Sequence, residues 1–369
     1  MKVLFFSNIP SPYRVEFFNL LAEKCDLTVI YERENASDRN ERWRADDNSK
    51  YKVHFMKGLY YSNDASISLD FTKYIKNKKY DVIVISGYSS LTQILLIRYF
   101  KRRKIPFVLN IDGAILKDES GVKRSIKSSL ISSASYWLST GEASDKYLIH
   151  YGARSENIFR YPFTSVSETH IIDSLINEDE KKEYKKAIGC DASKLVLSVG
   201  QPIHRKGFDI LIKAMKQFKD ADICTVIVGG APDPECEIEL EEARGSDIRF
   251  VSFKSQEELS VYYKAADLFV FPTREDIWGL VINEAMAYGL PIVTTDKCNA
   301  GLELVSDGVN GYVVPSENEV RLYDAVKEVL FDKNISSMSR ESLKRIKLYS
   351  LENMATEHIR IFENITGKH

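Results

Sequence analysis

The chain has 369 residues, of which 44% are hydrophobic and 28% charged, and its formal net charge is −2. This length is too great for one ordinary domain and predicts two. The composition is that of a soluble globular protein, and no apolar stretch reaches the ~18 to 20 residues that span a bilayer. The five cysteines are scattered without a Cys-x-x-Cys pair, which indicates a reduced, cytoplasmic protein without structural zinc.

Short apolar runs alternate with helical patterns in the first half of the chain. The start, from Met1 to Asn8, is too short for a signal peptide and indicates a buried strand. The predicted strands are 3–7, 27–31, 52–56, 82–86, 107–110, 136–139 and 158–161. The predicted helices are 13–22, 69–76, 90–101, 123–132 and 143–150. Apolar strands separated by amphipathic helices predict βαβ units and a parallel sheet with both faces covered.

The first half is also basic. Residues 1–165 contain 26 Lys and Arg against 18 Asp and Glu, a net of +8, whereas the remainder carries a net of −10. Such an asymmetry can indicate an anionic partner. Because the sequence has no zinc-finger spacing and no aromatic-rich RNA-binding signature, we expect an anionic membrane surface rather than nucleic acid.

Many of the basic residues lie in one predicted helix and shortly after it. The segment Ile94–Lys104, which overlaps the predicted helix 90–101, ends in four consecutive cations. The cations that follow it are Lys117, Lys123, Arg124 and Lys127. A helix with an apolar face and a basic end can dock on a bilayer, where each basic residue contributes about 1 kcal/mol. The alternative is a buried crossover helix whose cations complement its C-terminal dipole.

The pattern changes near the middle of the chain. Residues 164–191 are polar and predict an interdomain connection leading into a helix, with the charged run Glu178–Glu183 as its solvated face. The strands predicted after it are 195–200, 225–228, 249–252, 268–272, 292–295 and 312–314, and the last helices are 319–330, 337–349 and 351–365. Two doubly wound α/β domains are therefore expected, 1–165 and 166–350, facing each other across a cleft. Ligands of such sheets bind beyond the carboxyl ends of the strands.

The most informative segment is Phe271–Gly289. After its strand come Glu275 and Asp276, and Gly279 then opens a helix that carries Glu284. The N-terminus of this helix offers unpaired N–H groups and a positive dipole end, which suit a diphosphate. These N–H groups belong to Gly279, Leu280 and Val281. Carboxylates beside a phosphate site are better suited to hydroxyls, so a nucleotide sugar is one candidate ligand. The alternative is an ordinary strand–turn–helix in which Asp276 caps the helix.

A second candidate segment, Gly200–Asp209, follows the first strand of the second half. Its Arg205 and Lys206 stand near the carboxyl end of that strand, where they can neutralise phosphate charge that grows as a leaving group departs. The alternative is a solvated basic turn. Gly230, which follows the next strand, would permit close approach of a ligand.

These two segments, in this order, resemble the nucleotide-binding half of glycosyltransferase family 4. The resemblance covers the C-terminal half of the chain, including 265–272 and 307–311, whereas the N-terminal half matches only in pattern. It implies the GT-B fold, with two Rossmann-like domains, and sugar transfer with retention of anomeric configuration. It also implies that the helix at about 351–369 packs back on the first domain.

The resemblance implies a role for each donor-site residue. Glu284 would bind the ribose hydroxyls and Asp276 the hydroxyls of the donor sugar, while Lys206 would bind the diphosphate. The backbone N–H groups that would face the diphosphate or the sugar are those of Gly279, Leu280 and Val281. Two departures from the family pattern matter. Asp276 replaces the usual Glu with Glu275 beside it, so either acid could reach the sugar. Gln201 follows Gly200 where the family often has Arg, and Arg205 is the candidate to supply that charge.

The resemblance also implies that the first domain binds the acceptor. Tyr13 and Arg14 follow the first strand, and Arg14 is a candidate contact for an acceptor phosphate, with a plain βα loop as the alternative. Tyr88 and Asp112 follow later strands at the same sheet edge. Asp112 stands near the place where the family often carries a histidine close to the reacting centre.

Neither a metal nor another cofactor is expected. The six histidines form no metal-like cluster, and no paired acids suggest a magnesium-binding site. The resemblance implies front-face attack assisted by the leaving phosphate, since no carboxylate nucleophile is evident. The sequence therefore predicts a retaining, metal-independent hexosyltransferase that uses a nucleotide sugar, with UDP as the expected nucleotide, and a glycan or lipid-linked acceptor in cell-surface polysaccharide synthesis. It would lie in the cytoplasm, at the inner face of the membrane. The alternatives are a GT-B nucleotide-sugar epimerase and a non-catalytic nucleotide-sugar-binding subunit.

Overall fold

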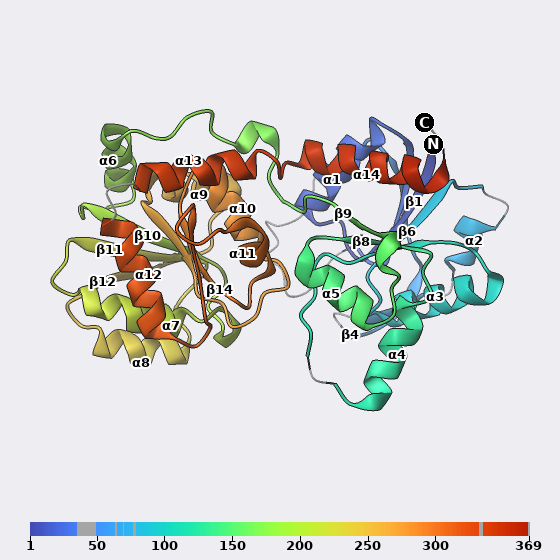
Figure 1. The fold of residues 1–369 in the computed structure, drawn as a ribbon, viewed down its shortest axis with the longest axis horizontal. Helices are drawn as coiled ribbons and strands as arrows, with labels where there is room; N and C mark the ends of the chain where they lie inside the picture. The colour runs from blue at the N-terminus through green and yellow to red at the C-terminus, as the bar shows by residue number, and fades with distance from the viewer. Residues whose placement is uncertain are drawn as a thin grey trace. The chain divides into compact units, whose positions relative to one another are not determined.

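The chain folds into two compact units (Figure 1). The computed structural model describes residues 1–34, 49–62, 65–68, 70–76, 79–117, 119–331 and 335–367. Unit 1 comprises Met1–Ser165 and Ser350–His369, and unit 2 comprises Val166–Tyr349. Each unit contains a parallel sheet with helices on both faces, so the two predicted doubly wound α/β domains are confirmed.

The sheet of unit 1 is parallel throughout its described length. Its strands are β1 (Lys2–Ser7), β2 (Asp26–Tyr31), β3 (Lys52–Phe55), β6 (Val82–Ser86), β7 (Val108–Asn110), β8 (Tyr136–Ser139) and β9 (Ile158–Arg160). They lie in the order β3-β2-β1-β6-β7-β8-β9. The central strands are apolar along nearly their whole length because helices cover both of their faces. The chain reverses its direction of progress between β1 and β6.

The helices of unit 1 follow the predicted ones closely. They are α1 (Pro12–Ala22), α2 (Thr72–Ile75), α3 (Leu91–Arg103), α4 (Gly121–Ile131), α5 (Glu142–His150) and α14 (Leu351–Thr366). A short 3₁₀ turn at Ser155–Asn157 follows α5, and another at Glu168–His170 lies at the start of unit 2. The predicted helix 69–76 was too long, since α2 begins only at Thr72, and Leu69 lies outside the described residues. The antiparallel pair β4 (Gly58–Ser62) and β5 (Ala65–Ser68) was not predicted.

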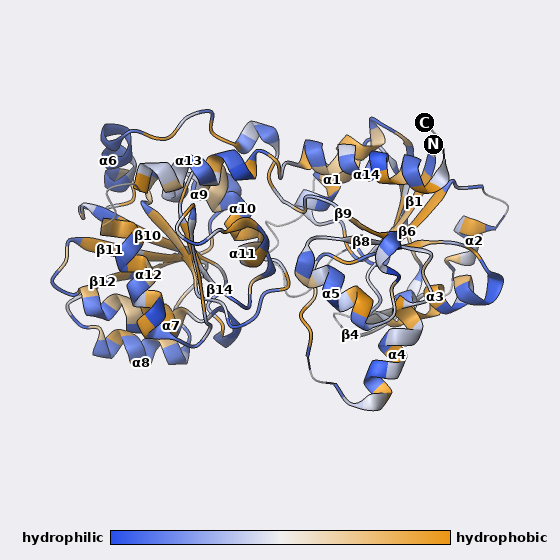
Figure 2. Ribbon diagram, viewed as in Figure 1, coloured by the Kyte–Doolittle hydropathy of each residue, from blue (hydrophilic) through white to orange (hydrophobic). Residues whose placement is uncertain are grey.

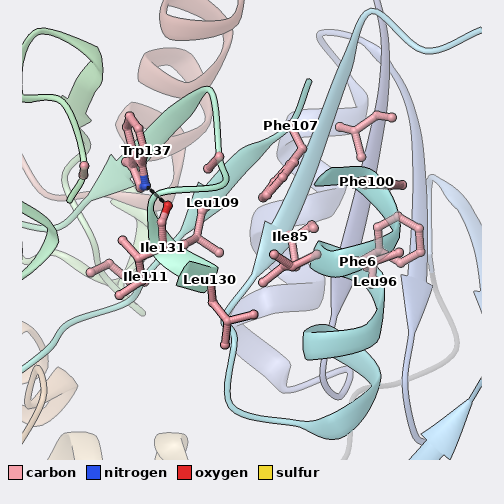
Figure 3. Packing of buried hydrophobic residues seen from close by; sticks show 14 of the residues in the cluster. Phe6, Ile85, Leu96, Phe100, Phe107, Leu109, Ile111, Leu130, Ile131 and Trp137 are labelled. Atoms are coloured by element: carbon pink, nitrogen blue, oxygen red, sulfur yellow. Dashed lines mark hydrogen bonds between the residues drawn. The ribbon is translucent and has the colours of Figure 1, made fainter. Parts of the chain in front are cut away.

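One core of unit 1 lies between the sheet and α3 (Figure 3). Phe100 of α3 contacts Phe6 of β1 and Phe107, which directly precedes β7. The apolar side chains Leu96 and Ile97 are fully buried. The apolar face of α3 is therefore occupied by its own sheet, as in the buried-crossover alternative, and its basic end is exposed.

The C-terminal helix α14 packs against α1 and so returns the chain to unit 1. Its buried residues recur at the spacing of one helical face: Leu351, Met354, Ala355, His358, Ile361 and Phe362. His358 is fully buried among the rings of Phe5, Phe17 and Tyr161. Its Nδ1 lies 2.8 Å from the carbonyl oxygen of Met354, and its Nε2 has no hydrogen-bond partner among the described residues.

His358 should make the stability of unit 1 depend on pH. Burial lowers the pKa of His358 to about 4, below its usual value of 6.5, so the unfolded chain takes up a proton first as the pH falls. We expect unit 1 to lose about 3 kcal/mol between pH 6.5 and pH 4 through this residue. Hydrogen exchange of α1 and α14 measures the loss. His358→Phe should remove this component, and an unchanged pH dependence in that variant would contradict it.

The sheet of unit 2 has the strand order β12-β11-β10-β13-β14-β15, and its described strands are all parallel. Its strands are β10 (Lys194–Val199), β11 (Ile223–Val228), β12 (Asp247–Val251), β13 (Leu268–Phe271), β14 (Ile292–Thr295) and β15 (Gly311–Val314). Its helices are α6 (Glu178–Ala187), α7 (Phe208–Met215), α8 (Pro234–Glu242), α9 (Gln256–Ala265), α10 (Leu280–Ala287), α11 (Asn299–Leu304), α12 (Glu319–Phe331) and α13 (Ile335–Ile346), with 3₁₀ turns at His204–Lys206 and Lys216–Phe218. The progress of the chain reverses between β10 and β13, and such a switch point is where open α/β sheets bind ligands.

The charged run at the start of unit 2 is not only a solvated face. Lys181 and Lys185 of α6 point at Asp267, which precedes β13, with Nζ–carboxylate distances of 3.1 and 2.8 Å. The Leu195 N–H donates to the same carboxylate at 2.8 Å. Asp267 therefore joins α6 to the two central strands. The sequence prediction missed this because the partners lie more than 70 residues apart.

Candidate functional site

Two loops meet at the switch point of unit 2. One runs from Gly200 to Gly207 after β10, and the other runs from Pro272 to Gly279 after β13. The carbonyl oxygen of Arg205 accepts hydrogen bonds from the Thr273 hydroxyl and the Arg274 N–H, both at 2.9 Å. The two segments singled out in the sequence are therefore in direct contact.

Arg274 holds the two loops together, and the sequence prediction did not single it out. Its guanidinium binds both carboxylate oxygens of Asp209 at 2.7 Å, donates to the carbonyl oxygen of His204 at 2.7 Å, and pairs with Glu317. Burial alone would raise the pKa of Asp209, but Arg274 outweighs this effect and lowers it. No local motif predicts this arrangement, because Asp209 and Glu317 are 65 and 43 residues away from Arg274 in the sequence.

Gly207 permits the close contact between the loops. Its φ is +68°, and a Cβ at this position would lie 2.2 Å from the carbonyl oxygen of Pro272. In a similar way, a Cβ on Gly229 would lie 2.0 Å from the carbonyl oxygen of Gly200. The backbones of the loops after β10, β11 and β13, which are neighbouring strands, thus touch at this sheet edge. The glycines are needed for contact between loops, whatever they do for a ligand.

We expect Gly207→Ala to be much more destabilising than Gly189→Ala. Both glycines have nearly the same φ, +68° and +70°, but no heavy atom lies within 4 Å of the position of a Cβ on Gly189. The control variant therefore measures only the free-energy cost of placing alanine in a left-handed backbone conformation, about 1 to 2 kcal/mol. Gly207→Ala adds a backbone clash of about 1 to 3 kcal/mol. Thermal unfolding measures the difference, and equal losses would show that the loops separate without cost.

Lys206 and Asp276 form the centre of the site. Their side chains are each 13% exposed, with Nζ and Oδ2 2.6 Å apart. The other oxygen of Asp276 accepts from the Trp278 N–H at 3.2 Å, and Lys206 Nζ lies 4.7 Å from the centre of the Phe271 ring. Asp276 does not cap α10, whose N-cap is Gly279, so the capping alternative is wrong.

Arg205 lies beside this pair and is more exposed. Its Nη1 is 3.5 Å from Asp276 Oδ2 and donates to the Glu275 carbonyl oxygen at 2.8 Å. Of the two adjacent acids, the carboxylate of Asp276 is the one that joins both cations. With two cations near one carboxylate, the cluster carries a positive charge that an anionic ligand can use.

The N-terminus of α10 opens next to this cluster. Gly279 has a φ of +100°, and a Cβ there would lie 2.7 Å from Cys298 Sγ. No described side chain caps the helix, so the first-turn N–H groups, including those of Leu280 and Val281, are not bound within the helix. The Trp278 indole donates to Asn283 Oδ1 at 2.9 Å and holds the turn against the helix.

Glu284 lies on α10 one turn after Leu280 and Val281, on the same side of the helix. Tyr263 of α9 donates to its carboxylate at 3.1 Å. Burial, together with the Glu284 charge, raises the pKa of Tyr263 well above its usual range, so this hydroxyl stays a donor. The Tyr263 ring stacks on Tyr288 at a centroid distance of 5.3 Å. Glu284 is thus held in place by α9 at the second turn of α10.

The remaining donor-site candidates lie around the same edge. Gly200 follows β10 directly, and Gln201 is exposed beside it. The N–H of Gly230 donates to the Val251 carbonyl oxygen at 3.1 Å, and a Cβ on Gly230 would lie 3.2 Å from Pro202. Gly230 therefore allows the loop after β11 to pass close to the loop after β10, and its N–H is already used within the sheet.

Unit 1 has its own polar cluster at the carboxyl edge of its sheet, centred on Asp112. Asp112 pairs with Arg14 and accepts from the Tyr161 hydroxyl at 3.0 Å and the Asn110 amide at 3.1 Å. The predicted contact of Arg14 with an acceptor phosphate is not supported, because its side chain is buried and bound to Asp112. Burial alone would lower the pKa of Arg14, but Asp112 outweighs it and raises the pKa, so the guanidinium stays charged. The Asp112 side chain, 30% exposed, is the member of the pair that solvent reaches.

The two tyrosines proposed for the acceptor lie in aromatic clusters. Tyr13 packs edge-on against Phe163, and the Arg14 guanidinium lies 5.5 Å from each ring centre. The Tyr88 hydroxyl is hydrogen-bonded to that of Tyr147. Both tyrosines are half-buried.

Within the described residues, no three His, Cys, Asp or Glu side chains are grouped as a metal site would require. The site in unit 2 consists of a paired lysine and aspartate, a second cation, an open helix N-terminus and a glutamate on that helix. Anion binding beside hydroxyl binding is the chemistry that these groups support.

Comparison with known proteins agrees with this description. Residues 180–347, most of unit 2, match the family model of glycosyl transferases group 1. The chain is 31% identical over 198 residues to the lipopolysaccharide core biosynthesis mannosyltransferase LpsB of Rhizobium meliloti, covering 50% of this chain and 56% of that one. It is 29% identical over 195 residues to the D-inositol 3-phosphate glycosyltransferase of Corynebacterium urealyticum, covering 49% and 46%. The chain thus spans about half the length of these relatives.

Solved structures show the same fold over the whole chain. HepE of Anabaena in complex with UDP has a TM-score of 0.77 at 18% identity, and sucrose-phosphate synthase of Thermosynechococcus elongatus has 0.76 at 16%. Each comparison covers 100% of both chains. The two-domain architecture is therefore that of GT-B glycosyltransferases, and unit 2 is similar to their group 1 domain. The finer assignment to family 4 stays a prediction.

Proposed function

We propose that the chain is a retaining glycosyltransferase that binds a nucleotide sugar at unit 2 and transfers the sugar to a glycan or lipid-linked acceptor. The observation that carries this proposal is the position of the Lys206–Asp276 pair, at the switch point of the sheet and beside the open N-terminus of α10. The names of similar proteins support it. LpsB is a mannosyltransferase of lipopolysaccharide core synthesis, and HepE has been solved with UDP-glucose.

Each group of the site has a place in this reaction. The diphosphate would lie against the first-turn N–H groups of α10, where the helix dipole favours negative charge. Lys206 would leave Asp276 in part and neutralise the charge that grows on the leaving phosphate. Asp276, which the Trp278 N–H also holds, would then turn one oxygen toward a hydroxyl of the sugar. Glu284, fixed by Tyr263, would accept the ribose hydroxyls.

The proposal assigns the neutralisation of the diphosphate to Lys206, Arg205 and α10 rather than to a metal ion. Arg205 would supply the charge that Gln201 does not carry. In unit 1, Asp112 would be the polar group closest to the acceptor, held at a defined position by Arg14, Tyr161 and Asn110. Tyr13 and Tyr88 would line the acceptor side.

A panel of nucleotide sugars tests the proposal directly. UDP-, GDP- and ADP-sugars should raise the unfolding temperature more the more tightly they bind, because a ligand at a hundredfold excess over its Kd stabilises the folded state by about 2.7 kcal/mol. We expect a UDP-sugar to have the largest effect. The stabilising sugar is then incubated with and without glycan acceptors. Sugar transfer supports the proposal, conversion of the donor alone would favour an epimerase, and binding without any turnover would favour a non-catalytic subunit.

Glu284→Gln should weaken binding of the stabilising nucleotide about 10- to 100-fold. The variant keeps an acceptor for Tyr263 but loses the charge that strengthens hydrogen bonds to the ribose, each worth about 1.5 to 3 kcal/mol. Titration calorimetry measures the change. Glu241→Gln is the matched control, since Glu241 is an exposed acid of the same unit. Equal affinity in wild type and Glu284→Gln would remove Glu284 from the site.

We also propose that the protein works in the cytoplasm at an anionic membrane surface, as the basic charge of residues 1–165 suggests. None of the described helices is long and apolar enough to cross a bilayer. Contact with a membrane would then depend on the surface of the folded units.

A further inference from the structure

One surface of unit 1 exposes apolar side chains among cations. It consists of the end of the segment before α4 and the first two turns of that helix, and is called here the α4 tip. Its residues are Leu116, Lys117, Val122, Lys123, Arg124 and Ile126. Val122 is 75% exposed, and Leu116 and Ile126 are each 46% exposed.

The α4 tip is exposed rather than buried in the core of its own unit. Every residue from Gly121 to Ile126 is exposed, and α4 buries its apolar side chains only at the other end, with Leu130 and Ile131. Figure 1 shows α4 running outward from unit 1, with its N-terminal end farthest from the sheet. In Figure 2 apolar and polar positions alternate along this outer part of the helix. A helix that buries apolar residues at one end and exposes them at the other has a second surface to cover.

The charge around these apolar side chains is positive. Lys123 and Arg124 are exposed between Val122 and Ile126. The described acid that precedes α4 along the chain, Glu119, is bound by Lys127 at 2.6 Å and by the Tyr151 hydroxyl at 2.9 Å, so it is neutralised within unit 1.

The basic end of α3 lies beside the second half of α4. Its last cations, Lys101–Lys104, are exposed, and Lys101 Nζ lies 3.5 Å from the carbonyl oxygen of Ser129 in α4. Of the apolar residues of α3, Leu96, Ile97 and Phe100 are buried, and Leu91, which is 43% exposed, lies at the opposite end of the helix from these cations.

This combination suits an anionic bilayer better than a protein. Two helical turns offer far less than the ~800 Å² per partner that a stable protein interface buries. In a bilayer, by contrast, a few apolar side chains enter the boundary of the headgroups while adjacent cations bind anionic lipid, so a small surface is enough. We propose that the α4 tip is the membrane-docking surface of this protein, with its apolar side chains inserted among the headgroups of anionic lipids. The proposal gives a surface to the membrane association suggested above, but its test needs neither donor nor acceptor.

Vesicle binding tests the proposal with the full chain and without nucleotide. Vesicles of phosphatidylcholine with about one third phosphatidylglycerol should bind the protein, vesicles of phosphatidylcholine alone should bind it much less, and added salt should weaken binding. Lys123→Gln with Arg124→Gln should lower the partition coefficient about fivefold per residue. Val122→Ser with Ile126→Ser should lower it about tenfold or more.

Matched controls separate this surface from general charge and exposure. Val320→Ser with Lys219→Gln changes one exposed apolar and one exposed basic residue of unit 2 and should leave binding unchanged. Thermal unfolding of each variant shows that it is folded. Vesicle binding that survives both α4 double variants, or that is equal on neutral vesicles, overturns the proposal. So does a dimer in light scattering that is lost in Val122→Ser with Ile126→Ser, since the surface would then join two copies. Sugar transfer to a soluble acceptor should be unchanged in these variants, because it needs no membrane. A failure of the membrane proposal would therefore leave the proposed function untouched.

Discussion

Replacing Lys206 by methionine is expected to lower kcat for sugar transfer about 10²- to 10³-fold. Lys206 is the cation best placed to neutralise the leaving diphosphate, and loss of one such preorganised group costs that much in comparable sites. The variant also leaves Asp276, only 13% exposed, without its nearest cation, 2.6 Å away. Steady-state kinetics with the stabilising donor measures the change. The loss should appear in kcat more than in KM, because the charge on the phosphate grows in the transition state.

Two further variants sharpen this test. Lys216→Met removes a lysine of the same unit that pairs with Glu242 at 3.0 Å, away from the site, and should leave kcat unchanged. Arg205→Gln removes the more exposed cation and should cost less, about tenfold. If Lys206→Met remained as active as Lys216→Met, the proposed role of the pair would be wrong. If Lys206→Met weakened the binding of a nucleoside monophosphate as strongly as that of a diphosphate, the loss would come from a disturbed loop and not from the missing charge.

Asp267→Ala is expected to reduce the free energy of unfolding of unit 2 by about 3 to 5 kcal/mol. Asp267 has a side chain that is 2% exposed and pairs with Lys185, itself 7% exposed. Removing one partner of a buried pair leaves an uncompensated charge, which costs that much. Hydrogen exchange of β10 and β13 reports on unit 2 alone.

Controls separate this buried cluster from surface charge. Asp179→Ala removes an acid whose side chain is 96% exposed, 3.8 Å from Lys182, and should change the stability by less than about 0.5 kcal/mol. Asp267→Ala combined with Lys185→Met should cost less than the sum of the two single changes, because the second change removes the unpaired charge. Full additivity would show that the two residues do not act as a pair.

The Asp267 cluster should also make the stability of unit 2 depend on pH in the acid range. Burial alone would raise the pKa of Asp267, but Lys181, Lys185 and the Leu195 N–H outweigh it and hold the pKa below its usual value. Its stabilising contribution is therefore complete above about pH 4, and it is lost as the pH falls through the lowered pKa. The loss from His358 begins at higher pH and concerns unit 1, so exchange rates in the two units should diverge between pH 6.5 and pH 4.

Much of the fold was predictable from the sequence. In unit 2 the strands β10 and β13 are continuous apolar runs because helices cover both faces of a parallel sheet, and such runs are recognisable without a structure. The hairpin of β4 and β5 was not predicted. Its sequence, Gly58–Ser68, has one strand-forming run of only three residues, 59–61, and no two-residue turn glycine, so the local pattern did not predict it.

By itself the sequence determined the two-domain α/β class, the positions of the strands in both parallel sheets and the two loops that carry the candidate donor site. Strands and loops follow from local order: apolar runs, glycines and charged residues that are close neighbours along the chain. Only the tertiary structure decided which side chains of that site meet. It joined Lys206 to Asp276 rather than to Glu275, brought Arg274 to Asp209, and withdrew Arg14 into a pair with Asp112. Ion pairs depend on distances between segments far apart in sequence, and adjacent acids with the same chemistry differ only in where the backbone directs them.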